Sequence, residues 1–211
     1  PVDIGTRLSD QPMIDPSGRM VNLRQFTGKV TLVSFIFTRC PDQSLCPAIS
    51  GKYAYLQKHL DPKKFHLVEI TLDPQYDSPA ILRGYGKLFG ADPSRWSLLT
   101  GEGSSIQQLL NAYGINSLRV SSSNFLHTDK LVIFDQHGKV ADIVQTAAWS
   151  PVDVAGEAEH ISGMMTNPFG RLRLSFVASI VALCGGSPYV GIIVMDSLIL
   201  IGGLIVAFCL L

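Results

Sequence analysis

The sequence lacks an excess of charge of either sign. Its 211 residues contain 17 lysines and arginines against 17 aspartates and glutamates. Only Arg171, Arg173 and Asp196 lie beyond residue 170, so the first 170 residues carry 15 basic and 16 acidic side chains, a net charge of −1. A nucleic-acid-binding domain needs a basic stripe or patch. The sequence has none, and we do not expect nucleic acid as a partner.

Charge is almost missing from the C-terminal end, where Asp196 is the only charged residue between positions 174 and 211. Residues 189–211 form an apolar run that would extend about 34 Å as a helix, enough to cross the hydrocarbon core of a bilayer. We therefore predict a transmembrane helix over 189–211. A carboxylate is costly in lipid, so Asp196 is expected to face a partner helix or the headgroup layer.

Breaker residues at 166–170 separate this end from a domain with charges of both signs. We predict a soluble domain over residues 1–168, an interfacial helix and linker over 169–188, and the membrane helix beyond. The apolar part of the linker, 172–183, is too short to cross a bilayer. The two arginines at its start would place the domain on the cytoplasmic side by a charge count alone.

Extended runs and helical runs alternate along the soluble part. The expected elements are a hairpin around a turn at 15–19, strands at 30–38, 65–72 and 96–99, helices at 47–60, 79–89 and 104–113, a second hairpin at 130–134 and 139–145, and a last helix at 151–164. This succession predicts an α/β domain with a central, mainly parallel sheet flanked by helices. It matches a thioredoxin-like domain with extra hairpins.

Cysteine is scarce, and the four cysteines fall into two groups. Cys184 and Cys209 lie in the apolar tail, where we expect them to be small buried residues. Cys40 and Cys46 follow a strand predicted to be buried and precede a helix, so they lie where open α/β sheets place their sites. This pair could be a disulfide, a metal clamp or a redox pair. A helix start favours a thiolate, and Cys46 is placed to feel this effect, whereas Cys40 lies on the more exposed loop.

One of the five histidines is placed to join the cysteines. His127 precedes the strand at 130–134 and is expected at the same end of the sheet as Cys40 and Cys46. Two thiolates and an imidazole form a soft trigonal set that suits copper. The remaining histidines are expected to be structural or exposed; they are His59, His66, His137 and His160.

The order of short motifs over residues 15–164 resembles the Sco/SenC proteins, copper chaperones and thiol-redox proteins of cytochrome oxidase assembly. The motifs are Gly28-Lys29-Val30, Phe37-Thr38-Arg39-Cys40-Pro41-Asp42, Cys46-Pro47, Asp73-Pro74, Asp77-Ser78-Pro79, Trp96-Ser97-Leu98-Leu99-Thr100-Gly101, and His127 ahead of Lys130-Leu131-Val132-Ile133-Phe134-Asp135 and Gly138.

The resemblance implies that Cys40, Cys46 and His127 bind one copper ion, as Cu(I) or Cu(II), and that Asp73 tunes these ligands without binding the metal. It implies a metallochaperone more than an enzyme. The expected partner is the copper subunit of cytochrome oxidase or another membrane respiratory complex, and the membrane helix adds lipid contact. An oxidising, extracytoplasmic location suits this chemistry better than the side given by the charge count.

Two departures from the family pattern keep other functions open. Five residues separate Cys40 from Cys46 where the family usually has three, and the apolar segment is C-terminal where the family's anchor is N-terminal. A thiol–disulfide oxidoreductase would need both cysteines but not His127. A non-catalytic accessory subunit of a membrane respiratory complex would keep the domain for docking alone.

Overall fold

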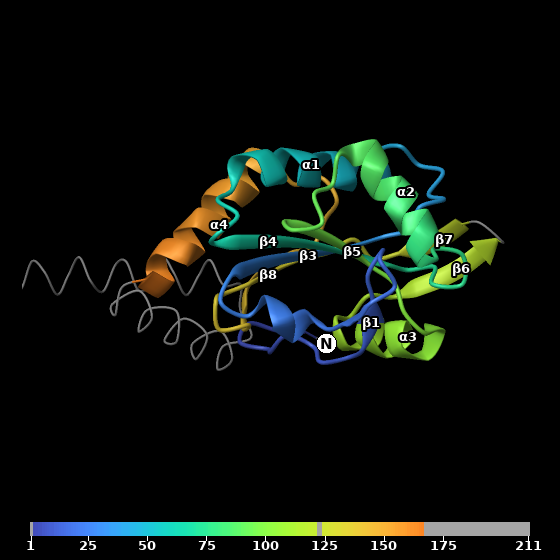
Figure 1. Ribbon diagram of the computed structural model, residues 1–211, viewed down its shortest axis with the longest axis horizontal. Coiled ribbons are helices and arrows are strands. Elements are labelled where there is room, and N and C mark those ends of the chain that lie inside the picture. Colours follow the sequence, from blue (N-terminus) through green and yellow to red (C-terminus); the bar gives the residue numbers. More distant parts are fainter. Residues whose placement is uncertain (1, 122–123, 167–211) are drawn as a thin grey trace, which may run out of the picture. The chain divides into compact units, whose positions relative to one another are not determined.

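A five-stranded sheet in the order β5-β4-β3-β8-β9 forms the centre of the domain in the computed structural model, which describes residues 2–121 and 124–166 (Figure 1). Its strands are β3 (Val30–Ile36), β4 (Phe65–Thr71), β5 (Trp96–Leu99), β8 (Leu131–Phe134) and β9 (Val140–Val144). Two short hairpins lie outside this sheet. They are β1 (Met13–Ile14) with β2 (Met20–Val21), and β6 (Ser117–Ser121) with β7 (Asn124–His127).

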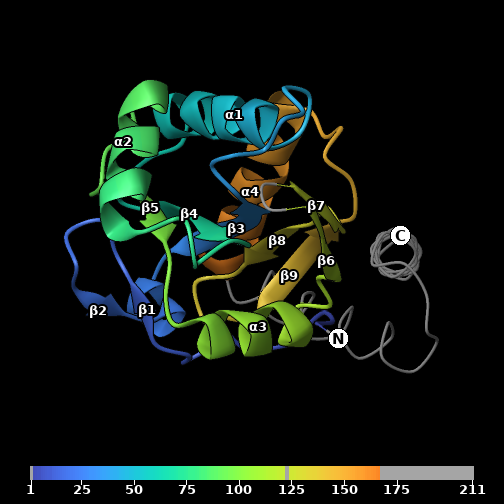
Figure 2. The ribbon, with the colours of Figure 1, turned by 90° about the vertical axis from the view of Figure 1, so that its right-hand side faces the viewer.

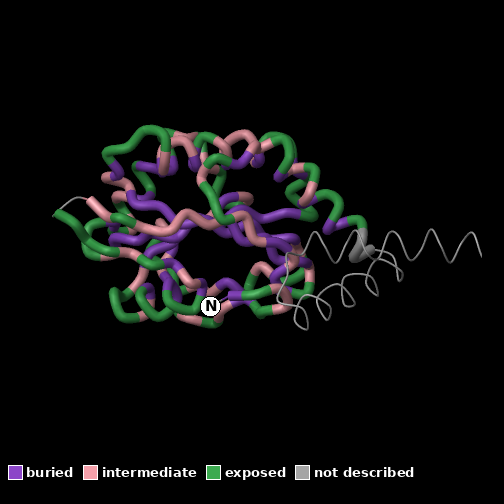
Figure 3. The backbone as a smooth tube through the Cα atoms, turned by 180° about the vertical axis from the view of Figure 1, so that it is seen from behind, coloured by how far each residue is buried: buried purple, intermediate pink, exposed green. Residues whose placement is uncertain are grey.

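The innermost strands are buried along their whole length. All seven residues of β3 and all seven of β4 are buried, and the two strands pair in parallel register from Val30 opposite Phe65 to Ile36 opposite Thr71 (Figure 3). Burial on both faces explains why both runs are almost continuously apolar and β-branched. β5 extends the parallel part, whereas β8 and β9 return as an antiparallel hairpin. The sheet is therefore mixed, with two parallel and two antiparallel pairs, rather than mainly parallel.

The helices cover both faces of the sheet, with α1 and α2 on one side and α3 on the other (Figure 1). They are η1 (Leu23–Phe26, a 3-10 helix), α1 (Cys46–His59), α2 (Pro79–Phe89), α3 (Gly103–Ala112) and α4 (Pro151–Thr166). The start of α2 is set by Ser78, whose hydroxyl accepts a hydrogen bond from the Ile81 N–H at 3.4 Å, and by Pro79 in the first turn. It ends at Gly90, which has a left-handed φ of 68°.

Most predicted elements are present with bounds close to those expected, but one hairpin was not predicted. The β6–β7 hairpin pairs Ser117 with His127 and forms a sheet of its own. His127 therefore lies on a strand, not on a loop ahead of one. The side chains of β6 are mostly exposed, so no buried apolar run marks this strand in the sequence.

No helix within 2–121 and 124–166 combines the length and apolar character needed to cross a membrane. The predicted interfacial segment 169–188 and membrane helix 189–211 lie outside the described residues and stay predictions. The compact unit that holds the sheet runs from Pro1 to Ser162.

Gly84 within α2 and Gly90 just after its end should respond to alanine in opposite ways. Gly84→Ala places a Cβ in open space within the helix and should raise the free energy of unfolding by about 1 kcal/mol, because alanine is the better helix former. Gly90→Ala also meets no neighbour but forces a left-handed φ on alanine, which should cost about 1 kcal/mol. Urea denaturation of both variants would measure the two shifts, and shifts of the same sign would contradict this account.

Candidate thiol and metal site

The loop after β3 is fixed at its first residues by the buried carboxylate of Asp77. The backbone N–H of Thr38 donates to Asp77 Oδ2 at 3.1 Å, and the Thr38 hydroxyl donates to Oδ1. The Thr71 hydroxyl, at the end of β4, donates to Oδ2 at 2.5 Å. Burial raises the pKa of Asp77, while these hydrogen bonds oppose that rise. Asp77 thus connects Thr38, at the start of the loop that carries Cys40, to Thr71 at the end of β4.

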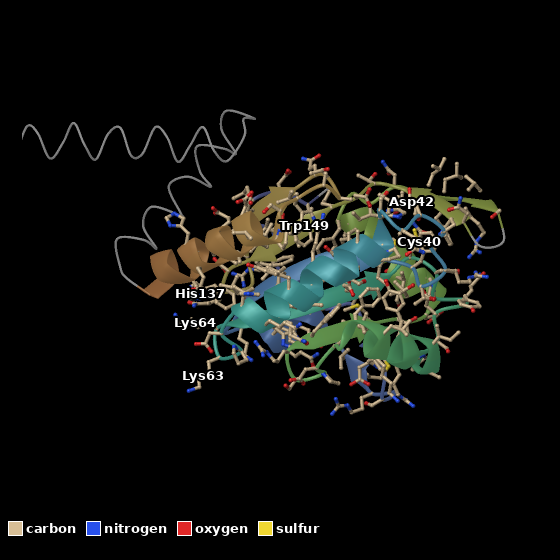
Figure 4. All side chains as sticks on the ribbon, turned by 90° about the horizontal axis from the view of Figure 1, so that it is seen from above. Cys40, Asp42, Lys63, Lys64, His137 and Trp149 are labelled. Atoms are coloured by element: carbon tan, nitrogen blue, oxygen red, sulfur yellow. The ribbon has the colours of Figure 1, made fainter. Side chains whose placement is uncertain are left out.

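Cys40 and Cys46 come together at the end of this loop. Cys46 is the first residue of α1 and fully buried, whereas Cys40 is 9% exposed. Both are free thiols, and their side chains hydrogen-bond to each other. Figure 4 shows Cys40 and Asp42 at one end of the domain, with His137 at the other. The loop of five residues between Cys40 and Cys46 is long enough to bring the two sulfur atoms into contact.

The two thiols differ in acidity. The hydrogen bond from Cys46 lowers the pKa of Cys40 to about 6, and a charged His127 would lower it further. The same hydrogen bond, together with burial, raises the pKa of Cys46. The coupling therefore favours the anion on Cys40 over the anion on Cys46. The sequence led us to expect the helix start to favour a Cys46 thiolate, and burial and coupling to Cys40 outweigh that effect.

His127 lies beside the same loop with one ring nitrogen unused. Its side chain is 2% exposed, and Nδ1 lies 3.5 Å from Asp129 Oδ1. The ring meets Phe37, three residues before Cys40, edge-on at 5.8 Å between centroids. Nε2 is buried and has no hydrogen-bond partner among the side chains and backbone that the structure describes. A buried nitrogen without a partner is costly, and a bound metal ion would satisfy it.

Asp73 connects the thiol loop to the hairpin of His127. Its buried carboxylate pairs with Arg39 at 2.5 Å and with Arg119 at 2.8 Å. Arg39 adjoins Cys40 and stacks over the Tyr76 ring at 3.8 Å. Arg119 lies on β6 and covers the Phe125 ring of β7 at 4.5 Å. Asp73 thus acts on the thiol loop and the hairpin through the two arginines.

The donor chemistry fits a soft metal ion, but the three predicted ligands do not surround one point. In the described part of the chain, no group of three or more histidine, cysteine, aspartate or glutamate side chains is close enough to hold a metal. In the structure Cys40 and Cys46 lie next to each other and His127 lies near them, but the three side chains do not form a complete metal site. Two thiols, one of them biased toward the anion, and a buried imidazole nitrogen are donors that copper prefers.

The other histidines have the structural or exposed positions predicted for them. His59, His137 and His160 are exposed, and His59 Nδ1 hydrogen-bonds to the Tyr55 carbonyl at 2.8 Å. His66 is buried, stacks on Phe26 and hydrogen-bonds through Nε2 to Ser97 Oγ at 2.9 Å.

Arg119 and Asp77 are site-forming residues that the sequence analysis missed. Asp77 belongs to a motif that the resemblance used, so its position after Asp73-Pro74 was a usable signal. Arg119 alternates with Leu118 and Val120, which is a period-two pattern typical of a strand. That pattern could have indicated β6, but nothing in it points to Asp73.

Comparison with known proteins identifies relatives of the whole domain. A model of the SCO1/SenC family matches residues 9–162. An SCO2-like protein of Rickettsia typhi is 28% identical over 135 residues, which cover 60% of this chain and 64% of that protein. The matched part is therefore less than two thirds of the relative's length.

Solved structures show the same fold. A SCO1/SenC family lipoprotein from Bacillus anthracis superposes with a TM-score of 0.65 at 24% identity, covering 74% of this chain and 95% of that one. ScoI of Bradyrhizobium japonicum with copper bound gives a TM-score of 0.62 at 23% identity, covering 75% and 99%. These similarities confirm the predicted thioredoxin-like α/β class. Because the family model spans the sheet, the thiol loop and the hairpin of His127, this chain belongs to the SCO1/SenC family.

Proposed function

We propose that this chain is a copper-binding, membrane-anchored protein that acts in assembly or maintenance of the copper site of a respiratory oxidase. The observation that carries the proposal is the pairing of the Cys40 and Cys46 thiols, which favours the anion on Cys40, near the buried Nε2 of His127, which has no hydrogen-bond partner in the part of the chain that the structure describes. A copper-bound ScoI with the same fold supports it.

Copper would be held by Cys40, Cys46 and His127, with one ion per chain. Thiolates select Cu(I), and an imidazole completes a set that also accepts Cu(II). The ion is cargo in this proposal, so the acceptor must offer a better set of ligands and take the metal by ligand exchange. The natural acceptor is the copper subunit of the oxidase, or another membrane respiratory complex.

The proposed location is extracytoplasmic, with the domain of residues 1–168 held at a membrane by the linker 169–188 and the helix 189–211. A cysteine pair that forms a disulfide or a copper clamp favours an oxidising compartment. The structural neighbour from Bacillus anthracis is a lipoprotein, which supports attachment to a membrane.

Copper binding should depend on all three proposed ligands. The reduced wild-type chain should bind about one copper, and Cys40→Ser or Cys46→Ser should abolish binding because a thiolate is lost. His127→Ala should also weaken affinity, because the imidazole ligand is lost, whereas the change His59→Ala at an exposed histidine of α1 should leave affinity unchanged. Metal analysis after reconstitution, with competition against a Cu(I) chelator, measures these effects. A wild-type chain that takes up no copper would end the proposal.

The second candidate function is thiol–disulfide exchange with a partner's cysteines. The low pKa of Cys40 favours it, because a thiolate on the more exposed sulfur is the attacking group and Cys46 can resolve the mixed disulfide. This function does not need His127. Full activity of His127→Ala in oxidase assembly would therefore favour exchange over copper delivery.

The reactivity of Cys40 should rise at lower pH than that of an ordinary cysteine. Only the thiolate reacts with iodoacetamide, so protonation below the pKa slows alkylation. The rate for the reduced, metal-free chain should increase with pH through a midpoint at about 6, and Cys46→Ala, which removes the thiol that lowers the pKa of Cys40, should move that midpoint upward. A single midpoint between about 8 and 9 for wild type, the value of a free cysteine, would contradict the coupling.

Asp73 should matter for the metal as well as for stability. Asp73→Asn removes the charge that both arginines share, and should lower the free energy of unfolding by about 1–3 kcal/mol, because the arginines stay partly exposed to solvent. It should also weaken copper binding by about tenfold through loss of the link to the hairpin.

The matched control for this variant is Asp15→Asn. Asp15 is also buried and paired with an arginine, Arg19, at 2.8 Å, but it does not touch the thiol loop. This control should lose stability while keeping its copper affinity. An equal loss of copper affinity in both variants would mean that Asp73 acts through stability alone.

A further inference from the structure

A carboxyl group, that of Glu69, is buried at the centre of the sheet. Glu69 lies on β4 and is 0% exposed, with Ser34 of β3 and Leu98 of β5 opposite it in the strand register. Neither of these two neighbours can titrate. The carboxyl points to the face of the sheet that α1 and α2 cover, where the two helices lie side by side (Figure 2). The copper and thiol chemistry proposed above does not use this acid.

Glu69 is a neutral acid at physiological pH. A buried carboxylate needs a cation, and in the described part of the chain no lysine, arginine or histidine forms an ion pair with it. Burial raises the pKa of Glu69 to about 8, and a hydrogen bond from Ser50 only partly opposes this rise. The titratable groups that face Glu69 from the two helices are acids that are uncharged when protonated: Cys46 and Tyr53 of α1, and Tyr85 of α2.

Ser50 connects this acid to both helices. Its hydroxyl donates to Glu69 Oε1 at 2.9 Å and lies 2.8 Å from the Tyr85 hydroxyl of α2. A serine hydroxyl has one proton, so the Tyr85 hydroxyl is the donor in the second bond. Ser50 is 0% exposed and Tyr85 is 8% exposed, so water competes little with either bond. Strand β4 and helices α1 and α2 are therefore linked through one serine.

The link lies one helical turn after Cys46. Cys46 and Ser50 are four residues apart on α1, which places them on the same face of the helix, and both are 0% exposed. A serine within a helix can turn its hydroxyl back to the carbonyl of the fourth residue before it, here Cys46, and such a bond bends the helix. The bond to Glu69 uses the hydroxyl proton instead. The first turn of α1 can then keep the direction that brings the Cys46 side chain to Cys40.

We propose that Glu69, as a neutral acid, is a positioning residue for the thiol pair, which fixes the first turn of α1 through Ser50 and so holds Cys46 against Cys40. This inference rests on the proposed thiol chemistry and adds to it a residue outside the proposed ligand set. The neutral state matters because a charge on Glu69 raises the pKa of Cys46 and would oppose formation of a second thiolate.

The acidity of Cys40 reports this positioning, because the hydrogen bond from Cys46 lowers the pKa of Cys40. In the reduced, metal-free full chain, tandem mass spectrometry would follow iodoacetamide alkylation of Cys40 alone as a function of pH. Ser50→Ala disconnects Glu69 from α1 and should move the midpoint upward by about half a pH unit or more. Glu69→Gln keeps an oxygen that accepts from Ser50, and should keep the wild-type midpoint.

The matched control is Ser97→Ala, the same substitution at a serine of β5. The Ser97 hydroxyl also makes one side-chain hydrogen bond, to His66 Nε2 at 2.9 Å, but neither residue belongs to α1. This variant should leave the Cys40 midpoint unchanged. No shift in Ser50→Ala, an equal shift in Ser97→Ala, or a shift in Glu69→Gln as large as that in Ser50→Ala would each overturn the proposal.

The charge of Glu69 gives a second readout, which a purely structural role would not change. The wild-type Glu69 ionises as the pH rises through about 8, whereas Gln stays neutral. Cu(I) affinity should therefore be equal in wild type and Glu69→Gln well below that pH, and lower in the wild type above it. Parallel profiles across this range would overturn the role of the charge. A wild-type chain that binds no copper would end the copper proposal, and the alkylation experiment would still decide this one.

Discussion

The buried carboxylate of Asp73 is the constraint on which the site depends. It lies just after β4 at 1% exposure, where an unpaired charge would be too costly to keep. Two guanidinium groups neutralise it, one beside Cys40 and one from β6. Arg39 and Arg119, about eighty residues apart in the sequence, are thereby both bound to Asp73. The thiol loop and the hairpin of His127 adopt their positions because both must supply a cation to the same acid.

The two thiols differ in acidity because their surroundings differ. Cys46 is fully buried at the start of α1. Its hydrogen bond with Cys40 and its burial raise its pKa, which favours the protonated thiol. Cys40 is closer to solvent and takes the negative charge. This division suits a soft metal ligand and an attacking thiolate equally well. The loop of this chain is thus suited to both proposed chemistries, and only copper binding would need His127.

The sequence predicted the parts of the structure that burial dictates. β3 and β4 are buried at every position, so their apolar runs were unambiguous, and Ser78 and Pro79 marked the start of α2. The β6–β7 hairpin was not predicted because neither strand has a buried residue: β6 is mostly exposed and β7 is mostly half-buried. The pairing of Asp73 with Arg119 joins distant positions, and the acidity of Cys40 depends on a sulfur contact. Contacts of this kind follow from the fold and cannot be obtained from local spacing.

The division of charge between the two thiols also fixes a proton stoichiometry. The lowered pKa of Cys40 favours loss of its proton before metal binding, whereas the raised pKa of Cys46 favours retention of its proton. A metal ion that binds both sulfurs then releases one thiol proton instead of two. Its apparent affinity rises by about tenfold per pH unit from the thiols, where two ordinary cysteines would give about a hundredfold. Metal binding by this pair would therefore depend less steeply on pH than binding by two ordinary cysteines.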